Sequence, residues 1–344
     1  MNLISIKYKA NYYALLLLAF VIPLERRLIA PLIIIFLLTS ILNGSIKKIE
    51  KKKVLLFSGI YILYLIGLLF STDVDGGLSD VMTKLALLIF PISFFISTID
   101  FTEKIRSILI SFIEGCFVSA LIAILVSALN YYYSVDLSVF FYGNIALFVH
   151  SSYLALFLSL CIAILYYYTL QGDELFKLKT KLSLFLVVFF SLFIILLSSK
   201  TGLITMLLIH FFAIIYLVFK TKAYVKGAII SLLLIVGLGL SYNYSDLFKG
   251  RIDELIDVVE SDKTNDSSTG ARKTIWLTAL DLMKEKPFFG YGTGDAKNTL
   301  VNEYQNKGFN FLYNKKLNAH NQFLQTVLAV GLIGLITLLL MLII

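Results

Sequence analysis

Charged residues are scarce in this chain of 344 residues. Asp, Glu, Lys and Arg make up 15% of it, against about 25% in soluble domains. Hydrophobic residues make up 59%, and the mean hydropathy is +0.88, which excludes an ordinary soluble domain. The apolar residues occur in runs of roughly 17 to 25, the length at which a helix crosses a hydrocarbon core of ~30 Å. We therefore expect an all-α polytopic membrane protein rather than a β-barrel.

Cysteine and nucleotide-binding motifs are also lacking. The two cysteines, Cys116 and Cys161, fall inside apolar runs, where cysteine is a small buried apolar residue rather than a disulfide partner or a metal ligand. The sequence contains neither a P-loop nor a Gly-x-Gly-x-x-Gly motif between a strand and a helix. We therefore expect no metal, no ATP and no reducing cofactor.

About ten apolar segments are candidate membrane spans. They lie near 10–24, 28–42, 54–70, 81–98, 105–129, 150–170, 182–199, 201–219, 223–241 and 320–344. The first lacks a small-residue cleavage site, so we treat it as an uncleaved span. The expected organisation is a transmembrane bundle of about nine spans over 1–241, a polar loop with short helices over 242–319, and a final span over 320–344.

The basic residues predict the orientation of the chain. If the N-terminus is cytoplasmic, fifteen Lys and Arg residues fall in the inner loops, and the short outer segments hold four: Arg26, Arg27, Lys84 and Lys200. Basic residues collect on the cytoplasmic side of membrane proteins. The net charge of +8 therefore reflects topology rather than a nucleic-acid partner. The loop over 242–319 is expected outside, in the periplasm or its equivalent.

Several polar residues in or near the spans allow two interpretations each. Asp73, Asp75 and Asp80 have a spacing that suits a hard cation, although an acidic solvated turn is simpler. His150, at the start of the sixth span, is either an interfacial hydrogen-bonding residue or a site residue. His210, near the middle of the eighth, is either a packing residue or part of a proton relay.

Two cations in the outer segments are candidates for binding an anion. Lys200 stands in a tight turn over 198–202, either as a lysine that marks the interface or as a contact to phosphate. Arg272 precedes a helix expected over 273–286, whose free N-terminal N–H groups favour an anion. An arginine without a partner fits the same pattern. The helical spacing predicts one apolar face, formed by Ile275, Trp276, Ala279, Leu280 and Met283.

The end of the chain combines several short motifs. The polar loop ends at His320-Asn321, and two glycines follow inside the final span. A turn-forming segment over 287–295 lies upstream. The complete set of residues is Arg272, Trp276, Tyr304, His320, Asn321, Gly331 and Gly334. This combination resembles the signature of the bacterial O-antigen ligase and O-antigen polymerase family, with weaker similarity at 150–153 and 199–202.

The resemblance implies the fold and the reaction of that family. The fold would be the O-antigen ligase fold, similar to that of C-type glycosyltransferases. The reaction would be a metal-independent glycosyl transfer at the outer face of the inner membrane. The donor would be a glycan on undecaprenyl diphosphate, and the acceptor would be the lipid A core for a ligase or the growing glycan for a polymerase. By position, His320 corresponds to the family's essential histidine and Arg272 to its loop arginine. Lys200 stands where many members have arginine, so it keeps the charge but not the forked guanidinium.

These residue types suit a reaction in which a hydroxyl attacks an anomeric carbon and a diphosphate leaves. Arg272 and Lys200 would stabilise the charge that develops on the diphosphate. His320 would either accept the proton of the hydroxyl or only orient the acceptor. Gly331 and Gly334 would let another helix approach the final span closely and so fix its position.

A transporter or flippase of lipid-linked glycan is the alternative from another class of protein. Such proteins typically contain internal repeats and ionisable residues near the middle of the membrane. The sequence shows no clear repeat, and apart from Glu114 and His210 its spans are nearly free of such residues. The sequence therefore favours the enzyme.

Overall fold

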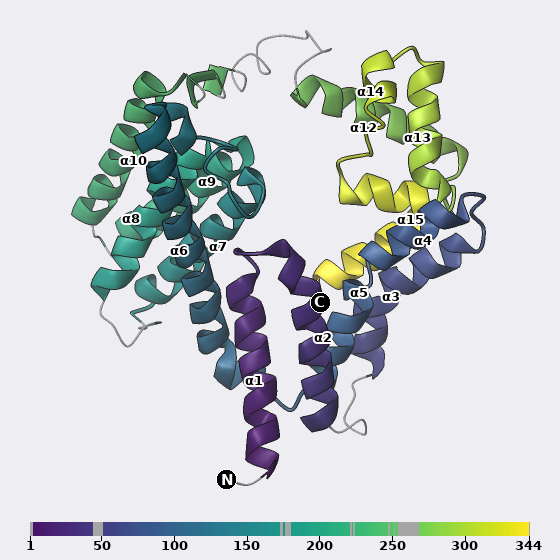
Figure 1. Cartoon of the computed structure of the whole chain (residues 1–344), viewed down its shortest axis with the longest axis horizontal. Helices are drawn as coiled ribbons and strands as arrows, with labels where there is room; N and C mark the ends of the chain where they lie inside the picture. The colour runs from purple at the N-terminus through teal and green to yellow at the C-terminus, as the bar shows by residue number, and fades with distance from the viewer. Residues whose placement is uncertain are drawn as a thin grey trace. The chain divides into compact units, whose positions relative to one another are not determined.

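The computed structural model describes residues 3–43, 51–172, 175, 180–220, 222, 224–246, 248–250, 252–253 and 268–343. Throughout these ranges the regular structure is helical and no strand is found (Figure 1). The principal elements are α1 (Leu3–Val21), α2 (Arg26–Asn43), α3 (Lys51–Leu68), α4 (Val74–Thr83), α5 (Ala86–Ile96), α6 (Phe101–Ser134), the short 3-10 helix η2 (Leu137–Phe140), α7 (Ser151–Leu170), α8 (Thr180–Leu197), α9 (Lys200–Phe219), α10 (Tyr224–Tyr244), α12 (Ser268–Glu285), α13 (Asp295–Asn306), α14 (Asn310–Asn314) and α15 (Gln322–Ile343). The all-α prediction is confirmed.

Seven stretches of the described chain are long and apolar enough to cross a membrane. They are α2, the α4–α5 stretch, α6, α7, α9, most of α10, and α15. The protein is therefore an integral membrane protein with several apolar helices. Helices α1, α3 and α8 also coincide with predicted spans, but α8 is counted only as a shorter apolar helix over Lys181–Leu197.

The predicted span over 81–98 falls in the α4–α5 stretch, which is apolar enough to cross a membrane but contains a break that was not predicted. Helix α4 ends at Thr83 and α5 starts at Ala86. Lys84 lies at the break, where its amine pairs with Asp80 and sits 4.6 Å from the centre of the Tyr64 ring. Hydropathy alone missed this break because the residues on both sides of Lys84 are apolar.

The first of two compact units consists of Met1–Leu32 and Ile99–Val259. Helices α1 and α6 pack at very short range, since a Cβ on Gly115 would lie 2.0 Å from the Phe20 carbonyl oxygen. The Ser119 hydroxyl also donates to the Pro23 carbonyl at 2.9 Å. The core of this unit involves α6, α7, α8 and α9. Cys116 and Cys161 are both buried there and form no disulfide.

His210 lies in the core of the first unit and is 2% exposed. Its Nδ1 is 2.8 Å from the Met206 carbonyl oxygen, and its Nε2 is 3.2 Å from the Ser191 hydroxyl. The Tyr166 ring meets it edge-on, with 5.5 Å between the ring centres. These contacts join α9 to α7 and α8, which agrees with the packing interpretation of His210.

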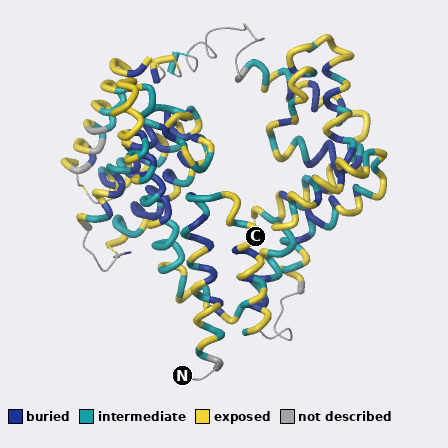
Figure 2. Tube along the Cα trace, in the orientation of Figure 1, coloured by how far each residue is buried: buried dark blue, intermediate teal, exposed yellow. Residues whose placement is uncertain are grey.

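The second unit consists of Ile33–Thr98 and Glu260–Ile344. Helix α15 packs against α3, α12 and α13, and α13 packs against α14. The buried stretches of these helices appear in dark blue in Figure 2. The helices of the polar segment therefore share a core with membrane helices.

The apolar face of α12 differs from the predicted one. Trp276 and Leu280 are 40% and 43% exposed, and the buried positions are Ile275, Thr278, Ala279 and Leu282. These four positions follow the i, i+3, i+4, i+7 spacing of one helix face. The prediction placed the face about one residue too far along the chain, because Thr278 is buried although it is polar.

Candidate functional site

The segment leading to His320 is held by the side chain of Trp276. The indole Nε1 donates to the Ala319 carbonyl at 3.1 Å, and Ala319 itself is fully buried. On the other side, the Ala319 N–H donates to the Gln325 side chain at 3.4 Å. Trp276 on α12 and Gln325 on α15 thus fix the backbone immediately before the histidine.

His320 and Asn321 together begin helix α15. His320 has a φ of +44°, a left-handed conformation that only a few per cent of non-glycine residues adopt. The Asn321 side chain accepts hydrogen bonds from the N–H groups of Phe323 at 2.9 Å and Leu324 at 3.3 Å. Asparagine is among the preferred residues for capping a helix in this way. The His-Asn pair therefore combines an exposed imidazole with a cap that fixes where the helix begins.

Arg272 acts on His320 through its charge. Partial burial, and then the positive charge of Arg272, lower the pKa of the His320 imidazole below its ordinary value. A neutral imidazole can accept a proton or a hydrogen bond near pH 7. The structure thus brings Arg272 and His320 into one electrostatic environment within the second unit.

The helix that carries Arg272 begins earlier than predicted. Helix α12 starts at Ser268, so Arg272 lies beyond its first turn rather than at its N-terminus. The expectation that free backbone N–H groups beside Arg272 help to bind an anion is therefore wrong. The guanidinium of Arg272 is exposed and supplies the positive charge by itself.

Polar side chains in the first turns of α15, shortly after His320, connect this helix to α3. The Gln322 amide donates to the Thr326 hydroxyl at 3.1 Å and to the Tyr64 hydroxyl at 3.4 Å. The hydroxyls of Tyr64 and Thr326 are 3.2 Å apart. Tyr64 and Thr326 are fully buried. This network fixes the first turn of α15, which follows directly after His320.

Helix α15 is broken at Gly331. Val330 and Gly331 have non-helical backbone angles, and Gly331 has a φ of 71° and a ψ of −168°. Carbonyls that the break leaves free accept hydrogen bonds from the turn over 287–295. The Tyr291 N–H donates to the Leu328 carbonyl at 2.7 Å, and the Gly292 N–H donates to the Ala329 carbonyl at 3.0 Å. The turn and the glycine motif therefore form one structural element.

The role of Gly331 differs from the one expected. A Cβ at this position would lie 2.0 Å from the Phe288 carbonyl oxygen, so the neighbour that needs the missing side chain is a turn and not another helix. A Cβ on Gly334 would lie 2.3 Å from a methyl group of Val330 and 2.9 Å from one of Thr326. The break in α15 thus requires glycine at position 331, whereas a side chain at position 334 would require the Val330 and Thr326 side chains to shift.

The turn is also joined to the loop before α4. The Asp295 carboxylate accepts from the Thr72 N–H at 2.8 Å, from the Thr72 hydroxyl at 2.9 Å and from the Asp73 N–H at 2.9 Å. Burial raises the pKa of the Asp295 carboxyl, but these hydrogen bonds outweigh the effect and lower it. Sequence reasoning missed this role of Asp295.

The three aspartates of the loop over 71–80 do not act as one group. Asp73 caps α4 by accepting from the Gly76 N–H at 2.8 Å, and it also accepts from the Asn298 amide at 2.8 Å. Asp80 pairs with Lys84. Asp73 and Asp80 thus have structural partners on α4, at the break after α4 and on α13, whereas Asp75 is exposed.

Tyr304 and Lys200 complete the predicted set. Tyr304 is fully buried in the core of the second unit and supports α13 and α14 rather than facing an exposed site.

Lys200 is the first residue of α9, directly after Ser199, whose hydroxyl accepts from the Gly202 N–H at 3.3 Å. Because Lys200 belongs to the first unit and His320 to the second, their convergence stays a prediction.

The fold and the candidate residues define a class of protein: an α-helical membrane protein in which the charge of an arginine lowers the pKa of a histidine that directly precedes a broken helix. Residues 185–339 match the sequence profile of the O-antigen ligase family. This region contains every residue of the predicted site, and its similarity to that family confirms the predicted resemblance. The family supports an O-antigen ligase or polymerase type of activity in a setting of lipid-linked glycan and membrane lipid. No curated protein matches the chain.

Proposed function

We propose that the protein is a membrane glycosyltransferase of the bacterial inner membrane. It moves a glycan from undecaprenyl diphosphate to an acceptor hydroxyl at the periplasmic face, with the N-terminus in the cytoplasm. The observation that carries the proposal is the pair formed by His320 and Arg272. The imidazole remains accessible at an exposed position, but the protein around it removes part of its solvent, and this desolvation and the charge of the arginine favour its neutral form.

In this reaction the acceptor oxygen forms a bond to the anomeric carbon while the bond from that carbon to the diphosphate oxygen breaks. His320 takes the proton of the acceptor hydroxyl, an effect typically worth about 100- to 10,000-fold in rate. The leaving diphosphate gains negative charge, which the Arg272 guanidinium stabilises through a forked pair of hydrogen bonds. Lys200 adds a second positive charge. The cleavage of the diphosphate ester drives the transfer, so neither a metal nor ATP is required.

Trp276 and Asn321 have positioning roles in this proposal. Trp276 holds the Ala319 carbonyl, and Asn321 caps α15, so the imidazole between them has a fixed backbone. Reacting groups must be held within a fraction of an ångström for efficient transfer. Gly331, Gly334 and the turn over 287–295 then fix α15 itself.

Ligase activity toward the lipid A core is the first candidate, and polymerisation of O-antigen or exopolysaccharide is the second. A strain that lacks the protein distinguishes them through its surface glycans. Unligated polymer that accumulates on the carrier lipid supports the ligase. Surface lipopolysaccharide capped with a single repeat unit supports the polymerase.

A transporter of the same lipid-linked glycan is tested with the purified protein. Detergent micelles contain no second compartment, so a transporter generates no new covalent product there. We expect the protein, supplied with donor lipid and acceptor, to form a glycosylated acceptor that mass spectrometry detects. An unchanged acceptor, with a folded protein and an intact donor, would contradict the enzyme.

A further inference from the structure

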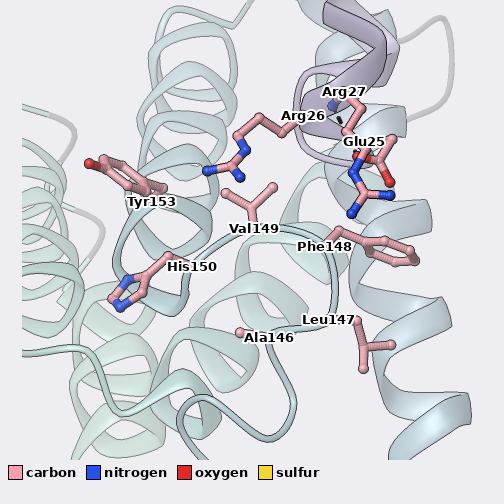
Figure 3. A pocket seen from close by; sticks show the side chains of 9 residues that line it. All are labelled: Glu25, Arg26, Arg27, Ala146, Leu147, Phe148, Val149, His150 and Tyr153. Carbon is pink, nitrogen blue, oxygen red and sulfur yellow. Dashed lines mark hydrogen bonds between the residues drawn. The ribbon is translucent and has the colours of Figure 1, made fainter. Parts of the chain in front are cut away.

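A polar cavity of about 390 Å³ lies within the first unit, between the α1–α2 turn and the beginning of α7. Its lining includes none of the residues that the proposed glycan transfer uses, although 150–153 is the segment of weaker similarity to the family. The lining residues come from two short segments (Figure 3): Glu25, Arg26 and Arg27 from the first, and 146–150 with Tyr153 from the second.

The cavity brings together donors that suit an oxyanion. Figure 3 shows the Arg26 guanidinium extending over Val149, on the same side as the Tyr153 ring. Arg26 and Arg27 are exposed. Within the described residues neither guanidinium has a hydrogen bond or an ion pair; the Arg27 bond at this site comes from its backbone N–H, which donates to the Glu25 carboxylate at 2.9 Å.

His150 supplies a further donor. Its Nδ1 accepts a hydrogen bond from the Ser152 N–H at 3.3 Å and so caps α7. In the neutral ring the proton is then on Nε2, which is free to donate. The N-terminus of α7 adds a partial positive charge at the same place. Two guanidiniums, an imidazole N–H and a helix N-terminus therefore surround one cavity.

The remaining lining residues restrict the kind of ligand. Leu147, Phe148 and Val149 are apolar, and this segment lies where a membrane helix begins. The Glu25 carboxylate is an acceptor beside the arginines, which suits a hydroxyl next to an anionic group. The ligand that matches these residues has an anionic oxygen group, a neighbouring hydroxyl and a hydrocarbon part.

Topology does not explain the two arginines. The charge pattern of the whole chain predicts that both arginines lie on the outer side of the membrane, where the short segments contain few other basic residues. The forked guanidinium of arginine can also donate two hydrogen bonds to one phosphate group, which a residue that only carries surface charge does not need. We propose that this cavity binds the phosphate group of a membrane amphiphile, with Arg26 and Arg27 on the phosphate oxygens and residues 147–149 beside the hydrocarbon.

The test measures binding, so it is independent of the proposed glycan transfer. The full chain in an uncharged detergent is titrated with dihexanoyl phosphatidic acid, a short-chain lipid phosphate, and heat of binding is recorded by calorimetry. Inorganic phosphate and glucuronate are titrated separately. We expect the lipid phosphate to bind more tightly than either. Equal affinity for inorganic phosphate would assign the site to free phosphate, and equal affinity for glucuronate would assign it to carboxylates; both would overturn the proposal.

The variants are Arg26→Gln and Arg27→Gln, both at exposed positions. Each removes a charged hydrogen-bonding group, so we expect the affinity for the lipid phosphate to fall about tenfold or more. The matched control is Lys9→Gln, which removes one positive charge from an exposed position in the N-terminal half of α1, whereas the cavity lies after the C-terminal end of this helix. We expect wild-type affinity in the control. Unchanged affinity in both arginine variants, or an equal loss in Lys9→Gln, would contradict the site.

Discussion

Replacing Gly331 by alanine tests the structural element that holds α15. The residue has a φ of 71° and a ψ of −168°, a region that is essentially restricted to glycine. A Cβ there would lie 2.0 Å from the Phe288 carbonyl oxygen and 2.5 Å from the Phe289 nitrogen. Real Cβ contacts are essentially never below 3.0 Å, so the turn must retreat by at least 1.0 Å, the difference between 3.0 and 2.0 Å.

The cost of this retreat can be worked from the hydrogen bonds that it breaks. The backbone strain contributes about 1–3 kcal/mol. The turn makes three hydrogen bonds with α15, through the N–H groups of Tyr291, Gly292 and Leu332, and each contributes about 1 kcal/mol. We therefore expect Gly331→Ala to destabilise the second unit by about 4–6 kcal/mol.

The assay uses Trp276, the only tryptophan in the chain. Its indole is bonded to the segment before His320, so its fluorescence reports on the second unit during thermal unfolding. The matched control is Gly239→Ala on α10, where an added Cβ meets nothing within 4 Å. We expect a lower melting temperature and altered emission in Gly331→Ala only. If the two variants unfold at the same temperature with wild-type emission, the broken helix is not the element described.

Three further changes give distinct results. Asp295→Asn puts an amide opposite the N–H donors of Thr72 and Asp73, so we expect a lower melting temperature. The wild type also loses stability as the pH falls below about 4 and through the lowered pKa of Asp295, and the variant does not. Melting curves recorded at several pH values measure this difference. Trp276→Phe leaves the buried Ala319 carbonyl without its donor, at a cost of about 1–3 kcal/mol, and both the circular dichroism melt and the transfer rate should decline. Arg272→Gln removes the charge that lowers the pKa of His320, so the acid limb of the pH–rate profile moves to higher pH; an unmoved limb would exclude the coupling.

The membrane helices could be predicted from the sequence because hydropathy is a local property. Runs of apolar residues mark α6, α7, α9 and α15 within a few residues of their observed bounds. The His-Asn motif was equally informative, since Asn321 caps the helix that begins beside it. The break in α15 could not be predicted, because two glycines in an apolar run are also typical of close helix packing.

Contacts between distant segments were the part that the sequence could not provide. Asp295 and Thr72 are 223 positions apart, and Trp276 and Ala319 are 43 apart. Neither pair has a local signal, since periodicity reports only on neighbours along one helix. Asp295 ends a glycine-rich turn, and that position was the only indication of a special role. Thr278 shows the opposite error, because a polar residue occupies a buried face of α12.

The central claim is that His320 carries out the transfer, and a single-turnover assay tests it most directly. Purified wild type, His320→Ala and the exposed control Asn314→Ala are each mixed with glycan on undecaprenyl diphosphate and an acceptor. We predict that wild type and Asn314→Ala form glycosylated acceptor, and that His320→Ala forms none while keeping the melting temperature and Trp276 emission of wild type. Product formation at the wild-type rate by His320→Ala would contradict the account.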